Sequence, residues 1–217
     1  MKLLKKEFSL CLHPAAVVFL GLSTLVLIPN YPPAISFFYV TLGIFFICMA
    51  GRENHDVAFT LTLPVSRQDA VAGRVLLACC LEILQVVLCG LLAFVKARVI
   101  GLPENPSGMD ANLALPGEGL LLFGLFNLVF FPAWYKDIRK VGVPFLMASA
   151  AVFVYIVAAV VATYALPFVR DQLDTPDPAF LTAKALFLLF AFVFYAGATF
   201  LAFRLSVRRF EKQDLQL

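Results

Sequence analysis

The chain has 217 residues, of which 62% are hydrophobic and 14% are charged, and its mean hydropathy is +0.92. About 25% of the residues of a soluble domain are charged, so this composition excludes an ordinary water-soluble protein and indicates a membrane protein. The formal net charge of +3 is small and unevenly distributed, which favours an orientation signal over nucleic-acid binding.

The N-terminal segment, residues 1–13, has an amphipathic helical pattern. Its apolar members share one face and its polar members the other: Leu3, Leu4, Phe8, Cys11 and Leu12 against Lys2, Lys5, Lys6, Ser9 and His13. We therefore expect an interfacial elbow helix, after which Pro14 turns the chain into the bilayer. The basic start is similar to that of a signal peptide, but no small-x-small cleavage site follows, so we expect the segment to be retained.

Six apolar runs follow, and crossing a hydrocarbon core of roughly 30 Å takes about 20 helical residues. The runs are Pro14 to Pro29, Pro33 to Gly51, Gly73 to Val95, Pro116 to Trp134, Val141 to Pro167 and Ala179 to Phe203. They lack the alternation of barrel strands, and a helix satisfies the backbone in lipid. The predicted fold is an all-α integral membrane protein with six transmembrane helices, in which residues 1–217 form a single transmembrane domain.

Lysine and arginine separate between the two sets of loops. Thirteen of the 17 lie on one side: Lys2, Lys5, Lys6, Arg52, Arg67, Arg74, Lys136, Arg139, Lys140, Arg204, Arg208, Arg209 and Lys212. Four lie on the other: Lys96, Arg98, Arg170 and Lys184. Because cytoplasmic loops retain positive charge, both termini are predicted to be cytoplasmic, which also favours an even number of spans.

The segment 53–72, between the second and third spans, is charged, capped and stopped by a proline. Glu53 and Asp56 are predicted to lie in the first turn of a short helix, where the helix dipole favours negative charge. Val57, Ala58 and Leu61 form its apolar stripe. Two interpretations remain open: the helix docks into a groove of another protein, or it rests on lipid headgroups.

A new helix is predicted to start directly after this short one. Pro64 ends the short helix, and Ser66 followed by Asp69 three residues later has the pattern of a capping box. Residues 53–72 therefore form a short helix, a rigid turn and a fresh helix start, an arrangement that transmits force better than a flexible linker.

Sites for chemistry are scarce. The sequence has no G-x-x-x-x-G-K-[ST] phosphate loop, no H-E-x-x-H pattern and no glycine-flanked serine elbow. The only histidines, His13 and His55, have no partner at metal-ligand spacing, and the five cysteines lie in apolar segments without redox spacing. We therefore expect no catalytic residues, no metal site and no cofactor bound by this chain, and an intramembrane enzyme is the least favoured class.

Three polar residues lie inside the predicted spans. Glu82 and Gln85 share nearly one face of the third span, and Asn127 lies in the fourth. A central carboxylate in a membrane helix costs roughly 2.5 to 3.5 kcal/mol on insertion scales, so it must face protein or water. These residues either line or seal a translocation path or form a hinge, or they lock the bundle by interhelical hydrogen bonds.

The stretch TLTLPVSRQDAVAGRVL resembles the segment after the second span in permease subunits of type-2 ABC exporters. The chain is most similar to the short six-span permeases typified by the exporter of phenol-soluble modulins. An N-terminal interfacial helix, six spans and a charged loop after the second span extend the resemblance over the whole chain. The LPFVRDQLDTPDP stretch departs from many members, which carry a larger element between spans five and six.

This resemblance implies a bacterial cytoplasmic-membrane subunit that pairs with a second permease chain, identical or homologous. It also implies two separately encoded ATPase subunits, which bind ATP and magnesium. Coupling to the ATPase is assigned to Glu53, Asp56, Val57, Leu61, Pro64, Ser66, Arg67 and Asp69, with a second, smaller contact at Trp134 to Lys140. The translocation path or its seal is assigned to Glu82, Gln85 and Asn127.

The expected substrate is an amphipathic peptide or a hydrophobic compound, with peptides favoured by the resemblance alone. The competing hypothesis is a membrane immunity or sensor-scaffold protein that binds a peptide or partner without transporting it. Substrate-stimulated ATP hydrolysis distinguishes the two.

Overall fold

The computed structural model describes residues 2–96, 108–110, 112–175 and 177–213, and every regular element among them is helical. The elements are α1 (Lys2–Lys6) with a π-helical continuation (Glu7–Cys11), α2 (Pro14–Gly21) with a 3₁₀ continuation (Leu22–Leu27), α3 (Pro33–Glu53), α4 (Asp56–Thr62), α5 (Arg67–Val95), α6 (Leu115–Trp134), α7 (Gly142–Ala165), a π turn (Val169–Leu173), a 3₁₀ turn (Pro178–Phe180) and α8 (Leu181–Glu211). The predicted all-α membrane fold is confirmed.

Five of the described helices, α3, α5, α6, α7 and α8, are long and apolar enough to cross a membrane. The helical stretches Leu3–Cys11 and Pro14–Leu27 meet the same test together, although an angle of 84° separates them. Counted as one broken span, they give the sixth. The predicted turn at Pro14 is confirmed: the extended His13 caps α2 by accepting a 3.1 Å hydrogen bond from the Ala15 N–H.

Two helices continue beyond the apolar runs into their polar flanks. α5 begins at Arg67, ahead of the apolar run at Gly73, which confirms the helix start predicted from Ser66 and Asp69. α8 continues past Phe203 to Glu211. Arg208 and Arg209 lie in its last turn, where the helix dipole favours positive charge. The segment between the third and fourth predicted spans lies largely outside the described residues, and Arg98 lies there with it.

α6 is the central helix of the bundle. Of its most hydrophobic stretch 78% is buried, against 17% for α7, and its most extensive contact is with α8. Three glycines let bulky side chains from neighbouring helices approach the α6 backbone: Gly117 faces Phe187, Gly119 faces Phe37, and Gly124 faces Phe194 and the Tyr195 backbone. Small residues allow close helix approach in the same way in membrane bundles generally.

Aromatic side chains fill the space along the second half of α6. Phe130 stacks on Phe126 with ring centroids 5.0 Å apart and on Trp134 at 6.1 Å. Tyr135 continues this column to Phe210 at the end of α8, at 5.2 Å. The column therefore ties the ends of α6 and α8 together by contacts of large apolar area.

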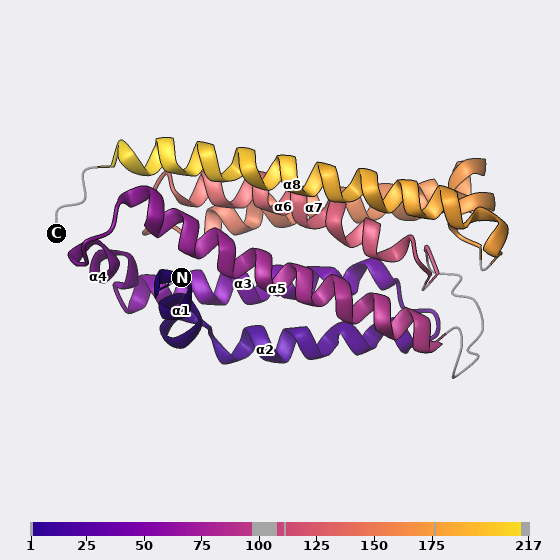
Figure 1. Cartoon of the computed structure of the whole chain (residues 1–217), viewed down its shortest axis with the longest axis horizontal. Coiled ribbons are helices and arrows are strands. Elements are labelled where there is room, and N and C mark those ends of the chain that lie inside the picture. The colour runs from indigo at the N-terminus through magenta and orange to yellow at the C-terminus, as the bar shows by residue number, and fades with distance from the viewer. Residues whose placement is uncertain (1, 97–107, 111, 176, 214–217) are drawn as a thin grey trace.

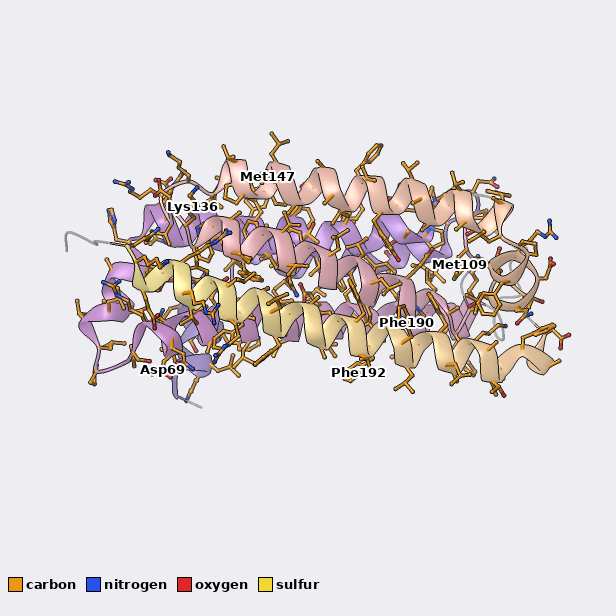
Figure 2. All side chains as sticks on the ribbon, turned by 90° about the horizontal axis from the view of Figure 1, so that it is seen from above. Asp69, Met109, Lys136, Met147, Phe190 and Phe192 are labelled. Carbon is orange, nitrogen blue, oxygen red and sulfur yellow. The ribbon has the colours of Figure 1, made fainter. Side chains whose placement is uncertain are left out.

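α1, α4, the C-terminal end of α8 and the turn between α6 and α7 lie at one end of the bundle (Figure 1). We call it the basic end, because the thirteen lysines and arginines assigned above to one side belong to it. α2 and α8 lie on opposite sides of the bundle (Figure 1). Met147 on α7 and Phe192 on α8 point outwards from it (Figure 2), and both side chains are more than half exposed.

A glycine pair tests this packing. A Cβ at Gly119 would lie 2.5 Å from the Phe37 ring, whereas one at Gly197 on α8 would meet nothing within 4 Å. We expect Gly119→Ala to cost about 1–3 kcal/mol through overpacking and Gly197→Ala to be neutral or stabilising by up to about 1 kcal/mol. Thermal unfolding followed by the fluorescence of Trp134 measures both, and equal effects of the two variants would contradict the close packing of α6.

Candidate functional site

A buried cluster of four charged side chains joins three elements at the basic end. Lys6 and Glu7 belong to the N-terminal segment, Asp56 is the first residue of α4, and Arg74 lies on α5. Lys6 Nζ lies 2.6 Å from Asp56 Oδ1 and 3.0 Å from Glu7 Oε1. Arg74 Nε lies 2.9 Å from Glu7 Oε2, and Arg74 Nη2 pairs with Asp56 Oδ2. Each cation thus contacts both carboxylates, so the charges of the ion-pair cluster balance.

Arg74 is the more deeply buried of the two cations in the ion-pair cluster. Its side chain is only 5% exposed, its Nη1 lies 3.4 Å from the Ile47 carbonyl oxygen, and its guanidinium lies 6.0 Å from the centre of the Trp134 ring. The neighbouring Gly73 lets α5 approach the N-terminal segment closely, since a Cβ there would lie 3.3 Å from Glu7 Cγ. Arg74 therefore connects α5 to α3, α6 and the N-terminal segment as well as to α4.

Asp56 is held as a carboxylate. Burial alone would raise its pKa, but the Arg74 guanidinium and the hydrogen bond from Lys6 outweigh burial and lower the pKa below its ordinary value of 3.8. Lys6 also donates a 2.7 Å hydrogen bond to Thr60 Oγ1, one turn further along α4. Asp56 and Thr60 thus fix α4 to the N-terminal segment at two points.

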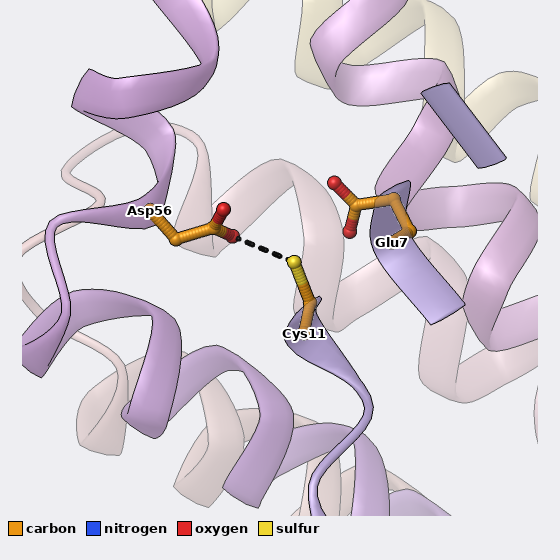
Figure 3. A group of neighbouring side chains, drawn as sticks. All are labelled: Glu7, Cys11 and Asp56. Carbon is orange, nitrogen blue, oxygen red and sulfur yellow. Dashed lines mark hydrogen bonds between the residues drawn. The ribbon is translucent and has the colours of Figure 1, made fainter. Parts of the chain in front are cut away.

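Glu7, Cys11 and Asp56 have the donor types of a metal site, and Figure 3 shows their side chains converging. The Cys11 thiol donates a 3.3 Å hydrogen bond to Asp56 Oδ2. Lys6 and Arg74 nevertheless contact both carboxylates already, and their positive charges repel a metal cation. The donor set therefore belongs to the ion-pair cluster and does not fit a metal centre.

α4 starts later in the chain than the sequence predicted. Glu53 is the last residue of α3 and is exposed, so placing it in the first turn of the short helix is wrong. The helical backbone is interrupted at Asn54 and His55. His55 adopts the left-handed conformation, with φ of 50°. Asp56 does lie in the first turn of α4, and α4 ends at Thr62, ahead of Pro64 as predicted.

The apolar stripe of α4 also faces the protein. Val57 and Leu61 are partly buried and pack against the hydrophobic core. Phe59 is instead the large apolar side chain of α4 that is exposed, at 52%. It borders a pocket of about 160 Å³ between the N-terminal segment, the end of α3 and α4, lined by Leu10, Cys11, Ala50, Gly51, Asn54, Asp56 and Phe59.

The turn from α4 into α5 forms a second junction. The predicted capping box is confirmed, because Ser66 Oγ accepts from the Asp69 N–H at 3.1 Å and Asp69 Oδ2 accepts from the Ser66 N–H at 3.1 Å. Arg67 Nη1 donates to the carbonyl oxygens of Phe210, Glu211 and Gln213 at 2.9–3.1 Å. Arg67 thus satisfies carbonyls at the end of α8, which have no partner within the helix.

The three polar residues of the spans lie in a buried layer between the helices. Glu82 Oε2 accepts hydrogen bonds from Tyr195 at 2.7 Å and from Asn127 at 3.0 Å, and Asn127 also donates to Thr199. Gln85 is directed to a different helix and donates to the Ser36 carbonyl oxygen of α3 at 2.6 Å. Glu82, Gln85 and Asn127 are fully buried.

This buried polar layer links α3, α5, α6 and α8 through bonds inside one chain. Its geometry favours interhelical locking over the lining of an open path.

Sequence reasoning did not identify the ion-pair cluster or Phe59. Its signals were present: Glu7 is the only acid in a basic N-terminal segment, and Arg74 lies within an apolar run. The contacts of Lys6 with Asp56 and of Glu7 with Arg74 join distant parts of the chain, which no local pattern specifies.

Comparison with known proteins gives one match. A family model described as "ABC-2 family transporter protein" matches residues 2–211. No curated protein and no solved structure matches the chain.

Removal of Arg74 tests the ion-pair cluster. Arg74→Met leaves two buried carboxylates with only Lys6 as partner, and we expect a loss of about 3–5 kcal/mol in the free energy of unfolding. Arg52→Gln is the control, because Arg52 pairs with Glu53 at the surface, where such pairs contribute about 0–1 kcal/mol. Unfolding in detergent measures both, and a loss below about 1 kcal/mol for Arg74→Met would contradict a buried cluster.

The lowered pKa of Asp56 predicts a pH range. Since the folded-state pKa lies below the unfolded value of 3.8, the stabilisation is fully present above that value and is lost as the pH falls through the folded pKa. We expect the emission of Trp134, the only tryptophan, to stay constant from pH 7 to 5 and to change below about pH 3.8. The variant Asp56→Asn should lack this acid transition, and a wild-type transition centred above pH 5 would contradict the assignment.

Proposed function

The chain belongs to the ABC-2 transporter family and is a membrane subunit of that kind, and we propose that it forms the transmembrane part of an ATP-driven exporter whose ATPases are separate chains. The family match over residues 2–211 supports this assignment, as do the five or six span helices. The sequence carries no phosphate-loop pattern, so ATP and magnesium are assigned to the partner subunits.

The observation that carries this proposal is that Phe59 is exposed on α4, a short helix whose opposite side is bound to the rest of the chain. α4 is held to the N-terminal segment and α5 by Asp56 and to the core by Val57 and Leu61. Phe59 and Thr62 of α4 are exposed, and so are Asn54 and His55 in the turn that precedes it. A partially exposed aromatic side chain on a rigid helix is typical of an anchor for a protein groove.

The docking surface proposed here replaces part of the sequence-based set. Asp56, Val57 and Leu61 position α4 from inside, whereas Phe59 and the exposed Glu53 are proposed to contact the ATPase. Pro64, Ser66 and Asp69 set the rigid turn into α5, and Arg67 links that turn to the end of α8. Motion imposed on α4 would thus reach the N-terminal segment, α5 and α8 together.

The surroundings of the subunit follow from charge and exposure. The thirteen cations at the basic end support a cytoplasmic location for both termini in a bacterial cytoplasmic membrane. The extensive exposed apolar faces of α7 and α8 leave area for lipid and for a second permease chain. For the substrate we propose an amphipathic peptide or a hydrophobic compound moving along the interface between permease chains, with the polar layer of Glu82, Gln85 and Asn127 as a seal within each chain.

Phe59 provides the test. We expect Phe59→Glu to lower recovery of the neighbouring ATPase from co-expressing membranes by roughly 30-fold, the loss of one anchor of about 2 kcal/mol. Phe168→Glu is a matched control, because Phe168 is 51% exposed but lies near the opposite end.

Equal recovery with both variants would refute docking through α4. A complex that forms but shows no substrate-stimulated ATP hydrolysis would instead favour a scaffold without transport.

A further inference from the structure

α8 exposes one continuous stripe along its outer face. Residues three or four positions apart share a helix face, and six exposed residues follow this spacing towards the basic end: Phe190, Val193, Gly197, Leu201, Arg204 and Arg208. Its first four residues are apolar or glycine, and its last two are arginines. The middle of the stripe is shallow, since a Cβ at Gly197 would have no neighbour within 4 Å.

The two arginines of the stripe are available to a ligand. Within the described part of the chain, Arg204 and Arg208 make no ion pair or hydrogen bond through their guanidinium groups. The other arginine near the end of α8 is occupied, because Arg209 donates a 2.7 Å hydrogen bond to the Pro132 carbonyl oxygen. Arg204 and Arg208 are one turn apart, about 6 Å along the axis.

The depth of Arg204 follows from the helix itself. No charged residue lies between Lys184 and Arg204, and this interval rises by about 30 Å, the thickness of a hydrocarbon core. Arg204 is therefore level with the boundary between acyl chains and headgroups on the basic side, and Arg208 lies within the headgroup layer.

We propose that this stripe is a binding site for an anionic phospholipid. An acyl chain lies along Phe190, Val193, Gly197 and Leu201, and the phosphate lies between Arg204 and Arg208. A guanidinium presents paired N–H donors that match the geometry of phosphate oxygens, and it is less strongly hydrated than an ammonium group.

Charge argues against a second copy of the chain as the occupant. Two copies related by a twofold axis along the membrane normal bring residues of equal height together, so contact through this stripe would gather four guanidinium groups. An ATPase outside the membrane cannot cover the part of the stripe that lies at the depth of the acyl chains. An anionic lipid matches both the charge and the length of the stripe.

The experiment uses the full chain reconstituted in phosphatidylcholine vesicles with trace spin-labelled phosphatidylglycerol or spin-labelled phosphatidylcholine. Electron paramagnetic resonance gives the ratio of the two association constants. We expect wild type to prefer phosphatidylglycerol by at least about fivefold, and Arg204→Gln with Arg208→Gln to lose most of that preference. Arg204→Lys with Arg208→Lys should retain part of it, because positive charge remains.

The matched control is Lys136→Gln with Lys212→Gln, which removes two exposed cations from the basic end but leaves the stripe intact. Unchanged Trp134 emission verifies the fold of each variant. The proposal is overturned if the arginine variant keeps its preference or the control loses as much. It is also overturned if inorganic phosphate abolishes the preference beyond the effect of sodium chloride at equal ionic strength, or if Gly197→Cys forms disulfide-linked dimers in the vesicles.

Discussion

The arrangement of the basic end depends on four charges that are removed from water together. A buried ion in a protein carries a desolvation cost of several kcal/mol, which only close partners offset. Lys6, Glu7, Asp56 and Arg74 meet this condition because each cation contacts both carboxylates. Such a cluster adds little net stability compared with apolar packing, but it strongly disfavours arrangements that separate its members. Its main effect is therefore to fix the N-terminal segment, α4 and α5 in one relative position.

Further contacts extend this fixed region into the bundle. Arg67 connects the start of α5 to the end of α8, Arg209 connects α8 to the Pro132 carbonyl of α6, and the aromatic column joins Trp134, Tyr135 and Phe210. Deeper in the membrane, Glu82 joins α5, α6 and α8 through one carboxylate oxygen. The outer faces of α7 and α8 are left largely uncovered, which is where lipid and a second subunit can bind. The chain thus combines a rigid basic end with exposed membrane-facing helices.

The sequence predicted the features that depend on local pattern. The apolar runs predicted the spans, because the thickness of the bilayer sets the length of a spanning helix. Ser66 and Asp69 predicted the start of α5, because a capping box involves only residues close in the sequence. Predictions failed where distant residues decide. Asp56 looked like a surface charge, but its partners are Lys6 and Arg74, and the Val57 and Leu61 side chains of α4 pack against the core of the same chain. Glu53 ends α3 and does not belong to α4, because His55 between the two helices adopts the left-handed conformation. This conformation is uncommon for a residue other than glycine.

The most direct measurement of the central claim is amide hydrogen exchange in the full chain, in lipid, for wild type and Arg74→Met. If the ion-pair cluster holds the N-terminal segment and α4 as one unit, both should lose protection together in the variant, while α7, which contributes no residue to the cluster, should keep it. Loss of protection confined to either segment alone, or unchanged exchange in both, would contradict the account.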